Sequence, residues 1–127
     1  MGKDALGSTW RGLDRSSGAR VDLREVPAWA NLADVRSWVS QITAVDHRGI
    51  LRTLSLVTEE ANAYVACEYC DGEPLFLRRQ RRPRRHFEVS EVRPWLKALA
   101  EAVAHLHGAG LVHVPSMAAT YLLKALN

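Results

Sequence analysis

The sequence predicts an α+β fold: an antiparallel sheet with one helix inserted between its strand pairs, followed by a long helix and a short C-terminal helix. Two pairs of segments alternate polar and apolar residues, as half-buried strands do. Residues 31–45 and 90–107 instead repeat their apolar side chains with the 3.6-residue period of a helix. Because the strands of each pair are joined by a short connection, we expect them to pair antiparallel.

Composition indicates one globular domain spanning residues 1–127. Of the 127 residues, 47% are hydrophobic and 24% are charged, which is typical of folded domains. The sequence has no run of about 18 uncharged apolar residues that would predict a membrane span, and no apolar signal region at its start. We therefore expect a cytoplasmic protein without membrane contact. Within the domain, residues 1–70 would form the sheet and first helix, residues 71–90 a connecting segment, and residues 91–127 the long helix and tail.

The first strand pair is predicted within residues 5–26. Residues 9–13 form the end of the first strand, and residues 20–26 alternate polar and apolar side chains. Between them, residues 14–18 read DRSSG, whose polar residues and final glycine favour a turn.

Residues 31–45 are expected to form the first helix. Asn31 is a good N-cap residue, and Asp34 in the first turn complements the helix dipole. The apolar stripe that would face the sheet consists of Leu32, Val35, Val39 and Ile42.

The second strand pair covers residues 53–57 and 63–69, joined by residues 58–62. Cys67 and Cys70 form a single C-x-x-C in this region. Structural zinc sites normally use four ligands, and residues three apart on a strand point to opposite faces. We therefore interpret both cysteines as buried structural thiols rather than as a redox or metal site, and predict no metal.

Six arginines concentrate the basic charge in residues 78–86, which read RRQRRPRRH. The other 11 basic residues face 14 acidic ones, so the rest of the chain is mildly acidic. Like charges this close repel one another and Pro83 interrupts a helix, which favours a loop. Two interpretations stay open: a solvated loop, or an electrostatic contact with an acidic protein, nucleic acid or another polyanion. The polyanion-binding candidates are Arg78, Arg79, Arg81, Arg82, Arg84 and Arg85.

The long helix is predicted to begin at Ser90 as N-cap and to end near His107. Glu91 complements the dipole of its first turn, and Pro94 lies near that turn, where its missing N–H costs little. Its apolar stripe consists of Leu96, Leu99, Val103 and Leu106. The glycines that follow suit a left-handed C-terminal cap. Residues 116–127 are rich in helix formers and predict a short final helix.

The order and spacing of these segments resemble the small lobe and the start of the large lobe of eukaryotic-like protein kinases, of the type found in bacteria. Residues 99–115 read LAEAVAHLHGAGLVHVP, similar to the helix that precedes the catalytic loop H-R-D-L-x-x-x-N. Residues 46–51 resemble the exit of the kinase C-helix. Cys67 falls at the gatekeeper position, residues 68–70 at the hinge, and residues 71–75 at the exit toward a short helix.

The resemblance implies that the catalytic positions are replaced. Gly7 matches the last glycine of the glycine-rich loop, and the preceding strand and glycines would fall before Met1. The lysine, glutamate, catalytic-loop histidine, base and magnesium-ligand positions fall on Arg24, Trp38, His113, Pro115 and Thr120, respectively. The D-F-G segment would fall beyond Asn127. We therefore expect a truncated, degenerate pseudokinase-like domain that is not an enzyme and has no cofactor.

The long helix then becomes the candidate binding element, because the helices that bury it in a kinase would be missing. A large exposed apolar patch marks an interface. We expect a regulatory or scaffold module that binds a partner protein or forms a homo-oligomer, through Trp95, Leu99, Val103, Leu106, Tyr121 and Leu122. The alternatives are a polyanion binder that uses the six arginines, and a weak nucleotide binder.

Overall fold

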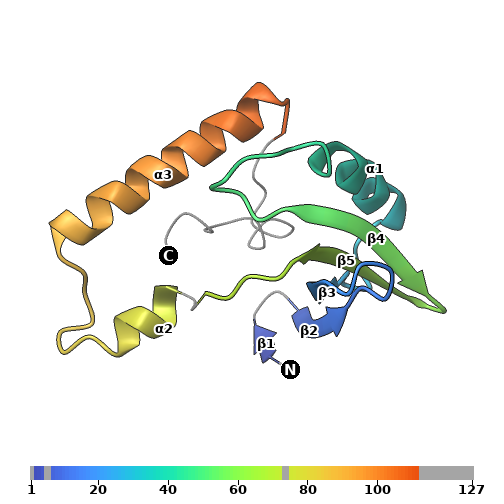
Figure 1. Ribbon diagram of the computed structural model, residues 1–127, viewed down its shortest axis with the longest axis horizontal. Helices are drawn as coiled ribbons and strands as arrows, with labels where there is room; N and C mark the ends of the chain where they lie inside the picture. The colour runs from blue at the N-terminus through green and yellow to red at the C-terminus, as the bar shows by residue number, and fades with distance from the viewer. Residues whose placement is uncertain (1, 5–6, 73–74, 112–127) are drawn as a thin grey trace.

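The computed structural model describes residues 2–4, 7–72 and 75–111, and it confirms the α+β fold (Figure 1). The described strands form one antiparallel sheet in the order β1-β2-β3-β5-β4. The strands are β1 (Gly2–Asp4), β2 (Gly7–Leu13), β3 (Arg20–Glu25), β4 (Thr53–Glu59) and β5 (Asn62–Glu68). The helices are α1 (Leu32–Ile42), α2 (Leu75–Gln80) and α3 (Val89–Gly108). The short helix predicted over residues 116–127 lies outside the described residues.

Strand β1 corrects the expectation that the strand before the glycine position would precede Met1. Gly2–Asp4 pairs antiparallel with β2, and Lys3 lies opposite Ser8. At three residues, the segment is too short to show an alternating pattern, which is why periodicity missed it.

The β2–β3 hairpin is confirmed, and its turn is fixed by one carboxylate. Asp14 accepts hydrogen bonds from the Ser16 N–H at 2.8 Å, the Ser16 hydroxyl at 2.7 Å and the Ser17 hydroxyl at 2.9 Å. These donors stabilise the charged form and lower the pKa of Asp14 to about 2. Gly18 supplies the left-handed backbone conformation, with φ +69°.

The β4–β5 pair is also confirmed, with a tighter connection than predicted. The strands extend to Glu59 and Asn62, so two residues make the turn rather than five. The first of these, Glu60, has φ +52°. Strand β3 lies on the other side of β5, which places Cys67 between Asp22 and Thr53.

Helix α1 begins as predicted but ends earlier. The Asn31 side chain accepts hydrogen bonds from the Ala33 N–H at 2.9 Å and the Asp34 N–H at 3.3 Å. The helix ends at Ile42, with Thr43 as C-cap, rather than at residue 45. Three members of the predicted stripe are buried, but Leu32 in the first turn is 41% exposed. Helix α1 packs against β4 (Figure 1).

The C-terminal end of α3 is attached to the segment that links α1 to β4. One buried cluster joins the two, and Trp38 packs against it. Gly49 lies against both sides of this contact, because a Cβ there would be 3.2 Å from the His47 ring and 3.4 Å from the Ala102 Cβ. The rings of His47 and His105 also meet, with centroids 4.8 Å apart. The cluster consists of Ile42, Val45, Ile50, Ala102, Leu106 and Leu111.

Two boundaries around the arginine run were predicted incorrectly. Residues 78–80 belong to α2 rather than to a loop, because arginine is itself a good helix former and the break comes only near Pro83. Helix α3 begins at Val89 with Glu88 as N-cap, so Ser90 is inside the helix and Pro94 lies in the second turn.

The end of α3 agrees with the prediction. The helix stops at Gly108, and Gly110 adopts φ +77°, the left-handed conformation of a C-terminal cap. None of the helices in the described part of the chain is long and apolar enough to cross a membrane.

Candidate functional site

The structure places three of the kinase-like positions on the sheet and first helix. Gly7 is the first residue of β2, Arg24 lies on β3 and Trp38 on α1. Arg24 is half-buried and lies opposite Thr9 and Val65 in the sheet. The other three positions, His113, Pro115 and Thr120, lie outside the described residues.

Trp38 is the residue that the resemblance matches to the glutamate of the kinase C-helix. Its side chain is half-buried and packs against the cluster that holds α3. An indole has no acceptor oxygen and no negative charge. This position therefore contributes to packing between α1 and α3 rather than to an ion pair with β3.

Asp22 is a residue of the site that sequence reasoning did not single out. It lies two residues before Arg24 and therefore on the same face of β3. Its Oδ2 accepts a hydrogen bond from the Cys70 N–H at 3.5 Å, and its buried Oδ1 has no hydrogen-bond partner in the part of the chain that the structure describes. The sequence could have drawn attention to Asp22, because it is an acidic residue two positions from Arg24 in a strand predicted to be half-buried.

Cys67 is fully buried, in an environment that disfavours its thiolate. Burial raises the pKa of the Cys67 thiol to about 11, because removal from water penalises the thiolate. The Arg24 charge lowers this pKa and the Asp22 charge raises it, as expected for charges beside the same thiol. Cys70 is half-buried, and both cysteines are free thiols. The predicted burial is confirmed for Cys67 and only in part for Cys70.

We predict that a thiol reagent at pH 8 modifies Cys70 much faster than Cys67. With a pKa of about 11, Cys67 has about one thiolate in a thousand at this pH. Mass spectrometry after a short iodoacetamide pulse would show one modified cysteine in the folded chain and two in urea. In Cys70→Ser the fast reaction should disappear. Equal labelling of both cysteines in the folded chain would contradict the buried environment of Cys67.

Helix α3 carries a wide apolar surface, although its composition differs from the prediction. Leu106 is 4% exposed and belongs to the core cluster, so it is removed from the proposed binding surface. Trp95, Leu99 and Val103 are half-buried. Tyr121 and Leu122 lie outside the described residues.

Two further residues, absent from the predicted set, extend this surface: Val89 is 71% exposed and Leu96 is 59% exposed. At 100° per residue, the five apolar positions fall within about 120° of the helix circumference. Trp95 is oriented by Phe87, whose ring it meets edge-to-face at 4.9 Å between centroids. We call Val89, Trp95, Leu96, Leu99 and Val103 the α3 apolar face.

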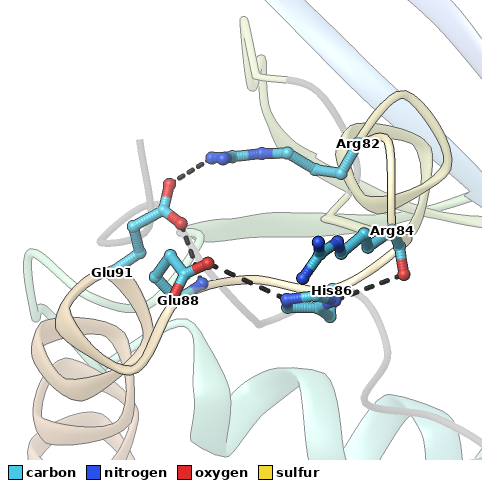
Figure 2. A network of polar contacts seen from close by, with 5 residues as sticks. All are labelled: Arg82, Arg84, His86, Glu88 and Glu91. Carbon is cyan, nitrogen blue, oxygen red and sulfur yellow. Dashed lines mark hydrogen bonds and ion pairs between the residues drawn. The ribbon is translucent and has the colours of Figure 1, made fainter.

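After α2 ends at Gln80, residues 81–85 of the arginine run form a turn that contacts the start of α3 (Figure 2). Arg82 forms an ion pair with Glu91 and lies 5.4 Å from the centroid of the Phe87 ring. Glu91 also accepts the Glu88 N–H at 3.0 Å. The Glu88 N–H and the Arg82 guanidinium hold the pKa of Glu91 below its usual range.

The same network includes His86, and not all arginines of residues 78–86 take part in it. His86 lies between the Arg84 carbonyl oxygen, 3.3 Å from Nδ1, and a Glu88 carboxylate oxygen, 3.8 Å from Nε2 (Figure 2). Arg82 forms the ion pair with Glu91, and Arg78 is half-buried. The exposed arginines are Arg79, Arg81, Arg84 and Arg85.

Within residues 2–4, 7–72 and 75–111, no three histidine, cysteine or acidic side chains are grouped to hold a metal ion.

Comparison with known proteins identifies the family of this arrangement. The family model for the protein kinase domain matches residues 5–114. The match includes strands β2 to β5 and helices α1, α2 and α3, and strand β1 lies before it.

Individual relatives are distant. The chain is 21% identical over 113 residues to the mouse serine/threonine-protein kinase Nek5, covering 89% of the chain and 18% of that protein. It is 26% identical over 118 residues to mouse serine/threonine-protein kinase 33, covering 89% of the chain and 23% of that protein. It is 35% identical over 69 residues to the human hormonally up-regulated neu tumor-associated kinase, covering 54% of the chain and 9% of that protein. The chain thus spans less than a quarter of the length of each of these relatives, all of which are eukaryotic.

Proposed function

The chain belongs to the protein kinase family, and from this premise we propose that it is a non-catalytic member that binds a protein partner or a second copy of itself through the α3 apolar face. Its role would be that of a regulatory or scaffold module, and we expect it to act in the cytoplasm. A bacterial-type origin stays a prediction.

The absence of catalysis is proposed from the residues at the catalytic positions. Phosphoryl transfer in this family needs a strand lysine on the phosphates, a glutamate that pairs with it, a catalytic base and magnesium ligands. Arg24 replaces the lysine with a broad planar guanidinium, which is not equivalent to a compact ammonium. Trp38 cannot form the ion pair. Pro115 and Thr120 stand at the base and magnesium positions in the sequence.

The exposure of α3 supports the binding role more than any other observation. The helix has 20 residues, about 30 Å of length, and only Ala102 and Leu106 are buried. Both lie near its C-terminal end, while Leu96 and Val89 toward the start are largely exposed. Figure 1 shows α3 extending away from the sheet from its attachment beside the α1–β4 segment. A contiguous apolar surface of this kind favours an interface.

Sedimentation velocity of the 127-residue chain tests the self-association form of this proposal. We expect a concentration-dependent dimer in the micromolar range. A stable monomer at these concentrations would exclude the homodimer and leave only a different partner protein. That form would then be tested by capture from the native cell with the wild-type chain and with Leu96→Glu. A protein retained equally by both would not be a ligand of the α3 apolar face.

A polyanion-binding role is the second candidate, and the arrangement of the arginine run favours it. Arg79, Arg84 and Arg85 are exposed, and the Arg82–Glu91 ion pair fixes the turn that carries two of them. Fixed cations lose less side-chain and backbone freedom on binding than cations on a mobile loop. No aromatic side chain interrupts residues 78–86, so stacking on single-stranded bases is not expected.

We predict that changing these three arginines to alanine removes salt-dependent retention on duplex DNA or heparin. Each lost phosphate contact lowers the slope of log K against log salt by about 0.9, so the triple variant should lose roughly 2.7. The matched control removes the same charge elsewhere, at the exposed Arg15, Arg36 and Arg48. If both triple variants weaken binding equally, the net charge of the chain is responsible and the arginine run is not a site.

A further inference from the structure

Strand β3 presents side chains of opposite charge on the face where a kinase holds its nucleotide. The position of Arg24 corresponds to the lysine that contacts the phosphates. Asp22 is two residues away on the same face, about 7 Å along the strand. Both charges affect the pKa of the Cys67 thiol, which agrees with the placement of Asp22 and Arg24 on the face of β3 beside Cys67. A nucleotide with its phosphates at Arg24 would therefore lie within reach of the Asp22 carboxylate.

The Asp22 carboxylate also accepts a hydrogen bond from a backbone N–H. Its Oδ2 accepts from the N–H of Cys70, a residue 48 positions later in the segment that follows β5. This segment resembles the hinge, where a backbone N–H is available to a flat heterocycle. A carboxylate only accepts hydrogen bonds, so Asp22 competes for the donor that an acceptor nitrogen of a base requires.

The residues around Asp22 are equally unsuited to a base. Binding sites for small planar ligands are lined mainly by apolar side chains. Here Arg11 lies opposite Asp22 on β2, and its guanidinium lies 5.2 Å from the centroid of the Tyr69 ring. Arg20 also lies over this ring, at 5.6 Å. The end of the sheet beside Cys70 is thus lined by charged groups.

We propose that Asp22 excludes adenine nucleotides from the β3 face, by taking the Cys70 N–H and by repelling the phosphates. Its negative charge acts over the few ångströms that separate it from Arg24, in surroundings less polar than water. The exclusion is a property of this side chain and does not depend on the α3 apolar face. One substitution at position 22 should therefore open the face, even though the catalytic positions remain replaced.

Isothermal titration calorimetry with adenosine, and separately with ATP and magnesium, tests the proposal on the full chain. The wild-type protein should show no saturable binding of either ligand. Asp22→Ala should show saturable adenosine binding, at least about tenfold tighter than the weakest affinity that the wild-type titration could detect, because the Cys70 N–H becomes free. Asp46→Ala, which removes an exposed aspartate elsewhere, should behave as wild type.

Asp22→Asn separates the two effects and guards against misfolding of the alanine variant. It keeps an acceptor oxygen for the Cys70 N–H but removes the charge, so it should bind ATP more tightly than wild type while adenosine binding changes little. Thermal melting by circular dichroism establishes that each variant is folded. Nucleotide binding by the wild-type chain would overturn the proposal, and so would a folded Asp22→Ala that binds neither ligand. Both results would leave the proposal for α3 unaffected.

Discussion

Replacing Ile42 with alanine is expected to lower the free energy of unfolding by about 2–5 kcal/mol, the range for deleting a large buried aliphatic side chain. Ile42 is 2% exposed and lies in the cluster that joins α1, the α1–β4 segment and α3. Small domains have free energies of unfolding of about 5–15 kcal/mol. The substitution therefore removes a large fraction of the total, and urea unfolding followed by circular dichroism would measure it.

The matched control is Leu32→Ala on the same helix. Leu32 belongs to the same predicted stripe but is 41% exposed, so its loss should cost less than about 1 kcal/mol. Because both changes shorten an aliphatic side chain of α1 to a methyl group, their helix propensities differ little. Equal destabilisation by the two variants would contradict the position of α1 against β4 and α3.

Leu96→Glu is expected to weaken self-association at least about tenfold and to leave the fold intact. Burying a leucine at an interface contributes about 1.5–3 kcal/mol, and a buried unpaired carboxylate adds a desolvation cost. Since Leu96 is 59% exposed in the single chain, a glutamate there remains solvated in the monomer. Sedimentation equilibrium of wild type and variant would measure the change in the dissociation constant.

Ala104→Glu provides the control for this substitution. Ala104 is exposed on the same helix and lies about 80° around it from Leu96. The introduced charge and side chain are the same, so only the position relative to the α3 apolar face differs. If the two variants associate alike, or if Leu96→Glu associates as wild type does, the α3 apolar face is not the dimer interface.

The alternating and helical periods of the sequence predicted most of the fold. The β2–β3 and β4–β5 hairpins, α1 with its Asn31 cap, and the end of α3 agree with the structure. Each of these has a local cause: side-chain alternation, a side-chain cap or a glycine with positive φ. The errors arose where such a cause was missing. Strand β1 is too short to show a period, and α2 continues through arginines that were expected to repel one another.

Contacts between distant segments were not predictable in this way. The sequence stripe of α3 gave no reason to separate Leu106, which is buried against α1, from Leu96, which is exposed. The pairing of Arg82 with Glu91 needs the turn geometry around Pro83. The Asp22 contact spans 48 residues and appears only once β3 and β5 are neighbours. The family resemblance supplied the succession of segments along the chain but not the side chains that alter the site.

The outer strands of the sheet limit how two copies of this chain can join. An exposed strand edge is a template for pairing with a neighbouring molecule. Here one edge is β1, which has three residues, and the other is β4, whose register is interrupted between Thr53 and Ser55. Short and irregular edges disfavour continuous ladders between molecules. A dimer formed by pairing of strands between two copies is therefore unfavourable. A dimer formed through the α3 apolar face would join two copies without extending the sheet, and so would not lead to fibres.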